Sequence, residues 1–179
     1  MADDRPATYA DSVLDREFFE ELGRFVSNCG HLEKVLWILF ATIARLDVEN
    51  EVDAARALQT SIKPFGVLIS DLRNLINKTD DLPEKICSAI QEMLDDISTD
   101  LIYRNLAVHG AWSSNGDHYR VSFFKKIQGE ARGNPDSYRA FAAPISLAEI
   151  RQASRTASAY LTRALELKRT LEDKRAQQA

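Results

Sequence analysis

The chain has 179 residues, of which 45% are hydrophobic and 28% charged, a composition that excludes a disordered chain and fits one folded domain. The net charge of −4 argues against a protein that binds nucleic acids through overall positive charge, so such binding would need local basic clusters. Two cysteines, Cys29 and Cys87, form no Cys-x-x-Cys pair, and we expect both to be buried thiols in a reducing cytoplasm.

The N-terminal part of the sequence predicts a loose arm and then a long helix. Residues 1–13 are small and polar, and they lack the apolar segment of a signal peptide. Apolar residues then recur at three- and four-residue steps over residues 15–46. Gly23 and Gly30 interrupt this pattern on one face, where we expect close approach of a neighbouring helix. The apolar run at 35–44 is too short to cross a bilayer.

The middle of the sequence predicts three more helical segments. The first is a short helix over residues 52–62, and the second covers residues 66–78. The third begins near residue 83 and should continue to about His109. Gly110 then ends it, because a left-handed residue is favoured just beyond a helix.

The pattern changes to that of a small β-structure after Trp112. SSNGD (113–117) predicts a turn. HYRVSFFKKI (118–127) is rich in valine and aromatic residues and predicts a strand, and SYRAFAAPI (137–145) predicts its partner. We therefore expect one β-hairpin in this region.

A capping-box sequence starts the last helix. Ser146 and Glu149 have the spacing at which side chains and backbone amides cap a helix start reciprocally. The helix should bury one apolar face, and its charged end at residues 174–179 should fray. The predicted fold class is mainly α: a single domain over residues 1–179, built as an up-and-down bundle of four to five helices with a small β-hairpin inserted before the last helix.

The candidate site is the segment YRNLAVHG (103–110), which contains Arg104, Asn105 and His109. A histidine transfers protons near neutral pH, and an arginine offers a fork of donors that matches a phosphate. An asparagine amide can orient a substrate as donor and acceptor. Together these groups suit cleavage of a phosphodiester without a metal, with the 2′-hydroxyl of RNA as the nucleophile.

The same residues also fit a helix end with no further function. Basic side chains are favoured in the last turn of a helix, where the backbone carries partial negative charge. Arg104, His109 and Gly110 satisfy these preferences. The chemistry of the segment leaves both interpretations open.

Helix geometry limits how the two charged groups could cooperate. Asn105 and His109 are four residues apart and share a face, whereas Arg104 and His109 point roughly 140° apart at about 100° per residue. Either the last turn loosens at Gly110, or a second copy of the helix crosses the first. A symmetric homodimer that pairs through the motif-bearing face would provide the second copy.

The motif Arg104-Asn105-x3-His109 resembles the signature of the HEPN superfamily (higher eukaryotes and prokaryotes nucleotide-binding domain). Three further features are similar to the bacterial branches of this superfamily. They are a helical bundle with the motif near the end of a late helix, the following Gly110-Ala111-Trp112, and the segment 30–33 in the first helix. The motif itself accounts for about ten residues of the resemblance. The expected arrangement of helices resembles that of the superfamily over most of the chain.

This resemblance implies a cytoplasmic, dimeric endoribonuclease that leaves a 2′,3′-cyclic phosphate, with Arg104 and His109 catalytic and Asn105 orienting. Such proteins are often toxins or phage-defence effectors, so single-stranded RNA and possibly an antitoxin or regulatory protein are the expected partners. The alternative is a non-catalytic HEPN-like module that binds a nucleotide or a protein. No tyrosine follows Gly110 as in the His-x-Tyr branch, which argues against a partner that modifies that tyrosine. No phosphate-binding loop or metal-ligand spacing occurs, so no cofactor is expected.

Residues outside the motif also have alternative interpretations. Glu33 lies on the apolar stripe of the first helix and needs a partner, which could be Arg104 or His109, or instead an arginine such as Arg73. Trp112 is expected to pack under the hairpin or to stack on a base. Basic residues of the predicted hairpin could guide an RNA backbone or simply face water: Arg120, Lys125, Lys126, Arg132 and Arg139. We expect His31 on the surface of its helix and His118 at a strand start facing water.

Overall fold

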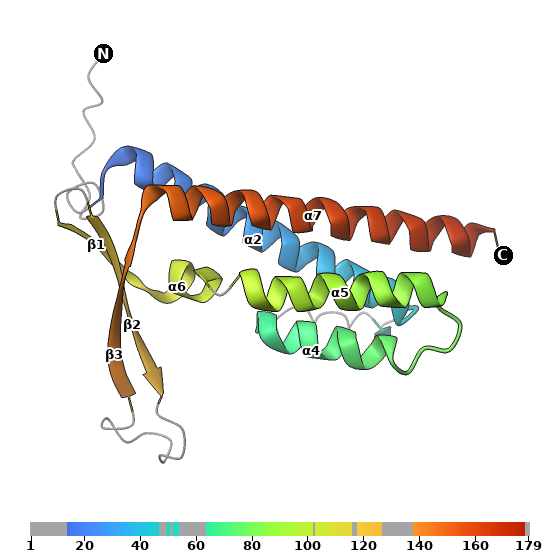
Figure 1. The fold of residues 1–179 in the computed structure, drawn as a ribbon. Helices are drawn as coiled ribbons and strands as arrows, with labels where there is room; N and C mark the ends of the chain where they lie inside the picture. The colour runs from blue at the N-terminus through green and yellow to red at the C-terminus, as the bar shows by residue number, and fades with distance from the viewer. Residues whose placement is uncertain are drawn as a thin grey trace. The chain divides into compact units, whose positions relative to one another are not determined.

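The computed structural model describes residues 14–46, 50, 52–53, 64–101, 103–115, 118–126 and 138–177 (Figure 1). The predicted arm and nearly all of the predicted helix over 52–62 lie outside these residues. The chain divides into two compact units, a sheet unit of residues 1–26 and 102–155 and a helical unit of residues 27–101 and 156–179. The division falls inside the first and last helices, and the single domain over residues 1–179 stays a prediction.

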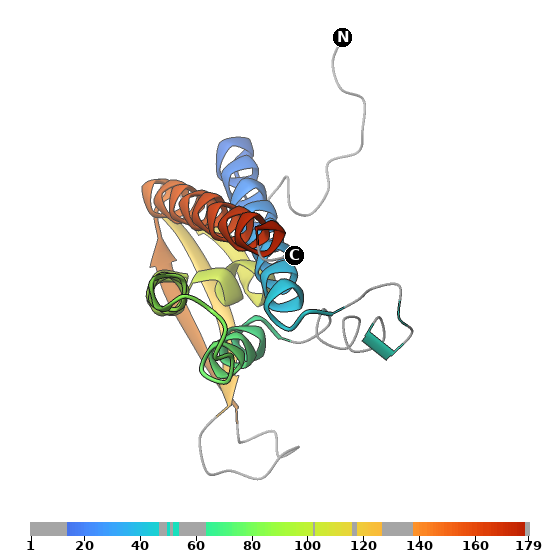
Figure 2. The same ribbon diagram turned by 90° about the vertical axis from the view of Figure 1, so that its right-hand side faces the viewer.

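The helical unit contains parts of α2 (Arg16–Ile43) and α7 (Leu147–Ala176) together with α4 (Phe65–Ile76) and α5 (Glu84–Asp100). Its helices are seen side-on in Figure 1 and closer to end-on in Figure 2. The buried residues come from every helix and include Leu32, Leu36, Leu39, Leu68, Leu72, Ile90, Met93, Leu94, Ile97, Ala157, Ala164 and Leu171. The stripes predicted from three- and four-residue spacing therefore form the core.

Two arginines make polar contacts between helices of this unit. Arg73 of α4 donates to Asp95 of α5 at 2.6 Å and to the Leu94 carbonyl at 3.1 Å. Arg163 of α7 pairs with Glu92 at 2.6 Å and with Asp96 at 3.1 Å, both on α5. Because these carboxylates are largely exposed, each pair contributes no more than about 1 kcal/mol, and burial of the apolar stripes dominates the stability.

The predicted helix over residues 83–109 is two helices. α5 ends at Asp100, and α6 (Tyr103–His109) starts three residues later. Leu101 leaves the helical conformation, with φ −96° and ψ 29°. Ser98 and Thr99 donate their hydroxyls back to the carbonyls of the preceding turn, at 2.7 and 3.1 Å. Such residues are less favourable in helix interiors, and the apolar spacing does not reveal the break.

The sheet unit contains three antiparallel strands in the order β1-β2-β3: β1 (Ala111–Asn115), β2 (His118–Lys126) and β3 (Tyr138–Ile145). The hairpin of the last two strands confirms the prediction. The first strand was not predicted, because Ser113–Asn115 have the composition of a turn. Pairing with β2 overrides this weak local preference, since Trp112 stands opposite Val121, which is fully buried. With this extra strand, the structure confirms the predicted fold class: mainly α, with a small antiparallel sheet before the last helix.

An aromatic cluster forms part of the core of the sheet unit. Phe18 of α2 is fully buried and stacks on Tyr119 of β2, with ring centroids 3.7 Å apart. Its ring also contacts that of Trp112 of β1, with centroids 5.4 Å apart and an interplanar angle of 57°. The apolar spacing that predicted the first helix thus also positions the residue that packs against the sheet.

The capping box at the start of α7 is confirmed in atomic detail. The Ser146 backbone N–H donates to Glu149 at 2.7 Å, and the Glu149 N–H donates to the Ser146 hydroxyl at 3.2 Å. The hydrogen bonds that the Ser146 N–H and then the Ser146 hydroxyl donate to the Glu149 carboxylate lower the pKa of that carboxyl below its usual value. The helix then continues to Ala176, further than the expected fraying at residue 174.

The two glycines of α2 do not mark a close helix contact. A Cβ atom added at Gly23 or at Gly30 would meet no atom within 4 Å. The predicted approach of a neighbouring helix is therefore wrong for the described residues. Cys29 is buried, as predicted, whereas Cys87 is half-buried.

Tyr160 provides a test of the α5–α7 contact. Its hydroxyl donates to Asp100, and burial, followed by this hydrogen bond and the carboxylate charge, raises the pKa of Tyr160 above its ordinary value. We expect Tyr160→Phe to lower the free energy of unfolding at pH 7 by about 0.5–1.5 kcal/mol, through loss of the hydrogen bond.

This difference should shrink as the pH rises above 10. The unfolded chain ionises a tyrosine with an ordinary pKa, whereas the folded protein holds the proton, so the tyrosine stabilises the fold fully only below that pH. Denaturant titrations of both proteins at pH 7 and pH 11 measure the difference. An equal difference at both values would show that the hydroxyl is not held in this way.

Candidate functional site

α6 presents the motif on a short helix of seven residues that contacts β2. Arg104 lies in its first turn and is half-buried, and His109 is its last residue and is exposed. Asn105 belongs to the same helix, although its side chain lies outside the described part of the structure. The guanidinium and imidazole therefore come from one helix, and the imidazole is accessible to a substrate.

The regular geometry of α6 keeps Arg104 and His109 on different sides of the helix. At about 100° per residue, their directions differ by roughly 140°. The last turn does not loosen, because the Gly110 N–H donates to the Leu106 carbonyl at 2.8 Å. One of the two ways to bring the groups together is thereby removed. A single α6 does not aim both side chains at one atom.

Gly110 is required for space and not for a left-handed conformation. Its φ lies outside the positive region, so the predicted left-handed stop is wrong. A Cβ atom here would lie 2.4 Å from the Leu106 carbonyl oxygen and 2.2 Å from a methyl group of Val121. The absence of a side chain allows α6 to end directly against β2, and Ala111 already belongs to β1. His109 is consequently held at a junction with no intervening loop.

Trp112 packs within the sheet unit, as one of its two interpretations predicted. Its ring contacts Phe18 and is half-buried. The indole Nε1 is buried without a hydrogen-bond partner among the residues that the structure describes. Such a donor is costly unless water or a ligand accepts from it.

Glu33 belongs to the helical unit, whereas Arg104 and His109 belong to the sheet unit. It is half-buried and lines a pocket of about 290 Å³ together with Trp37 and Leu68. Its predicted support of Arg104 or His109 stays a prediction. The alternative partner, Arg73, makes the contacts with α5 described above.

Some of the other basic and histidine candidates are exposed, and the side chains of the rest lie outside the described part of the structure. His31 of α2 and Arg120 of β2 are exposed, which confirms the surface position expected for His31. The side chains of the other predicted basic positions lie outside the described part: His118, Lys125, Lys126, Arg132 and Arg139.

Comparisons with protein families, curated proteins and solved structures find no match for this chain. Within the described residues, no three His, Cys, Asp or Glu side chains lie close enough to hold a metal ion. None of the described helices is both long enough and apolar enough to cross a membrane. The resemblance of the motif to the HEPN signature therefore stands on the sequence alone.

The junction at Gly110 can be tested with a matched pair of substitutions. We expect Gly110→Ala to lower the free energy of unfolding by about 1–3 kcal/mol, because the new methyl group collides with backbone. Gly30→Ala is the control, since it adds the same methyl group to open space in a helix. It should raise stability by about 0.5–1 kcal/mol. Chemical denaturation followed by circular dichroism measures both, and an unchanged stability of Gly110→Ala would contradict the described junction.

Proposed function

We propose that the protein is a HEPN-type endoribonuclease that cleaves RNA without a metal ion and acts as a homodimer. The observation that carries the proposal is the exposed imidazole of His109 on the same short helix as the Arg104 guanidinium. A proton-transfer group and a phosphate-binding group thus occur together at positions that match the HEPN motif.

The proposed reaction is an attack of the RNA 2′-hydroxyl on the neighbouring phosphorus. The 2′-oxygen–phosphorus bond forms, the bond from phosphorus to the 5′-oxygen breaks, and a 2′,3′-cyclic phosphate remains. A base removes the proton of the 2′-hydroxyl, and an acid protonates the departing 5′-oxygen. His109 would perform one of these transfers, and Arg104 would stabilise the additional charge on the phosphorane. Asn105 would orient the phosphodiester.

The dimer follows from the divergence of Arg104 and His109 on a regular α6. Two copies of α6 related by a twofold axis could place the arginine of one protomer near the histidine of its partner. In this arrangement one site needs one guanidinium and one imidazole, each from a different protomer. Val108, which is 44% exposed beside His109, would lie within this contact.

The proposed biological setting is the cytoplasm, where single-stranded RNA would be the substrate. A toxin or phage-defence effector is the role implied by the motif, and an antitoxin or regulatory protein is the corresponding partner. If the motif does not act catalytically, the same surface would serve as a nucleotide- or protein-binding module.

The proposal predicts that the purified protein cleaves single-stranded RNA in the presence of EDTA. We expect His109→Ala to reduce the rate about 10²- to 10⁴-fold through loss of proton transfer. Arg104→Ala should reduce it about 10²- to 10³-fold through loss of charge stabilisation. Gel analysis of an end-labelled RNA gives the rates, and chemical analysis of the products identifies the cyclic phosphate.

His31→Ala is the matched control, since it removes another exposed histidine from a different helix and should leave the rate unchanged. Circular dichroism of each variant separates a catalytic loss from unfolding. If the clean wild-type protein binds RNA or nucleotide without cleaving it, the binding module is the better account. Loss of folding in both motif variants would instead assign the motif to helix capping.

A further inference from the structure

The outer face of the three-stranded sheet carries small side chains around one arginine. Side chains alternate between the two faces along each strand, and Val121 and Ile145 are buried on the inner face. The positions that face outward are Ala111 and Ser113 of β1, Arg120 and Ser122 of β2, and Ala142 and Pro144 of β3. All of them are exposed except Ser122, which is half-buried. Arg120 is the one long side chain in this set.

Arg120 has no partner of opposite charge across the sheet. It lies on the middle strand, where its direct neighbours are Ser113 of β1 and Pro144 of β3. Opposite charges at such paired positions are what stabilise a charged residue in a sheet. No carboxylate among the described residues forms an ion pair with Arg120, whereas Arg16 and Arg151 of the same unit each pair with a glutamate. The positive charge of Arg120 is therefore available to a ligand.

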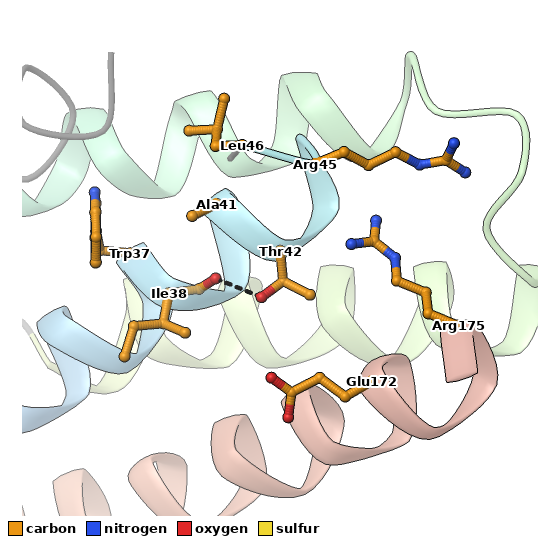
Figure 3. Close-up of a pocket in the computed structure, with 8 residues that line it drawn as sticks. All are labelled: Trp37, Ile38, Ala41, Thr42, Arg45, Leu46, Glu172 and Arg175. Carbon is orange, nitrogen blue, oxygen red and sulfur yellow. Dashed lines mark hydrogen bonds between the residues drawn. The ribbon is translucent and has the colours of Figure 1, made fainter. Parts of the chain in front are cut away.

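The arginines at the main pocket of the helical unit differ from Arg120 in this respect. This pocket of about 430 Å³ lies at the C-terminal ends of α2 and α7 (Figure 3). Arg45 ends α2 in a left-handed conformation, with φ 53°, and pairs with Asp81. Arg175 donates to the Ile43 carbonyl at 3.4 Å. Figure 3 shows Trp37 at the opposite end of the pocket from both guanidinium groups. These arginines are used to cap and connect helices.

The sheet is locally basic within an acidic chain. The chain contains 27 aspartate and glutamate residues, and none of them belongs to the sequences of the three strands, which contain four lysines and arginines. A chain of net charge −4 needs such a local cluster to bind a nucleic acid. An exposed arginine alone is explained by solvation. The absence of every carboxylate from three adjacent strands is explained better by an anionic partner.

This face of the sheet lies near the proposed catalytic histidine. A Cβ atom added at Gly110 would lie 2.2 Å from a methyl group of Val121, and these two residues directly follow His109 and Arg120 in the chain. Because consecutive Cα atoms are about 3.8 Å apart, the Cα atoms of His109 and Arg120 lie within about 15 Å of each other. β1 is an edge strand, and Ala111, its first residue, has a side chain too small to obstruct a bound chain. A ligand longer than a dinucleotide can extend from His109 to Arg120.

We propose that the outer face of the sheet binds the backbone of the single-stranded RNA substrate beside the cleavage site. Arg120 and Ser113 hold a phosphate outside the scissile position, since arginine and serine donors both match phosphate oxygens. The described outward residues include no aromatic ring on which a base could stack, so this contact is independent of base sequence. The inference rests on the ribonuclease proposed above, because it assigns the binding of that enzyme's substrate.

Fluorescence anisotropy of the full chain with RNA that cannot be cleaved tests the binding. The probes are two 2′-O-methyl oligonucleotides, one of uridines and one of adenosines. Arg120→Gln should weaken binding of both about tenfold. It should also reduce the slope of log affinity against log salt concentration by about 0.7, the value for one lost phosphate contact on a single strand. Wild-type affinity in this variant, a loss confined to one of the two sequences, or no RNA binding by the wild type would overturn the proposal.

Two further variants separate charge from folding. Ser113→Glu places a carboxylate beside Arg120 and should weaken binding to a similar extent while keeping the arginine. Arg169→Gln removes an exposed arginine of the helical unit and should bind as the wild type does. Circular dichroism verifies that each variant is folded. Unchanged binding in a folded Ser113→Glu protein would contradict a phosphate held between these strands.

Cleavage assays distinguish this inference from the proposed ribonuclease itself. A dinucleotide contains only the scissile phosphate and does not reach Arg120. We therefore expect Arg120→Gln to lower kcat/KM about tenfold for a cleavable oligonucleotide and to leave kcat/KM for the dinucleotide unchanged. An equal loss for both substrates would overturn the binding role. RNA binding that depends on Arg120, in a wild-type protein that cleaves no RNA, would refute the ribonuclease and support the sheet face as an RNA-binding surface.

Discussion

The absence of a side chain at residue 110 is the constraint on which the proposed site depends. Because a Cβ atom at Gly110 would collide with both the Leu106 carbonyl and Val121, α6 can end against β2 only with glycine at this position. The helix passes into β1 without a loop, so the backbone of His109 is held by α6 on its N-terminal side and by β1 on its C-terminal side. The junction thus fixes the backbone position from which the exposed His109 side chain would act in the proposed reaction.

The regularity that anchors His109 also separates it from Arg104. The hydrogen bond from the Gly110 N–H to the Leu106 carbonyl shows that α6 stays regular to its end. This regularity fixes the angle between the directions of the Arg104 and His109 side chains. A protein could resolve this within one chain by bending the helix, and α6 does not bend at this point. Symmetric pairing of two helices solves the same problem without further sequence, and it gives an exposed Val108 an apolar contact. The proposed chemistry and the proposed oligomeric state are therefore one hypothesis.

Local sequence signals predicted the parts of the fold that depend on local physics. The capping box of Ser146 and Glu149 is visible in the sequence because both partners lie within one turn. The apolar stripe that includes Phe18 and Leu36 is equally local, because helix spacing alone decides which residues are buried. The residue types and spacing of the α6 motif likewise suggested a site, whose catalytic role stays a proposal.

Features that depend on distant partners were not predictable in the same way. β1 forms because it pairs with β2, although its own residues favour a turn. The break between α5 and α6 falls at Leu101, in a segment with uninterrupted apolar spacing. Arg45 and Arg175 are far apart in the sequence and share no pattern, so their pocket emerges only in three dimensions. The positive φ of Arg45 has no sequence signal, since glycine is the residue expected there.

The most direct test of the central claim is complementation within mixed dimers. Arg104→Ala and His109→Ala chains, carrying different affinity tags, are co-expressed, and the heterodimer is purified through both tags. Each homodimer lacks every copy of one group, whereas the heterodimer keeps one guanidinium and one imidazole. If these groups act across the twofold axis, the heterodimer recovers a substantial part of the wild-type rate of RNA cleavage. A heterodimer as inactive as either homodimer, beside an active wild-type protein, would contradict a cleft assembled from two protomers.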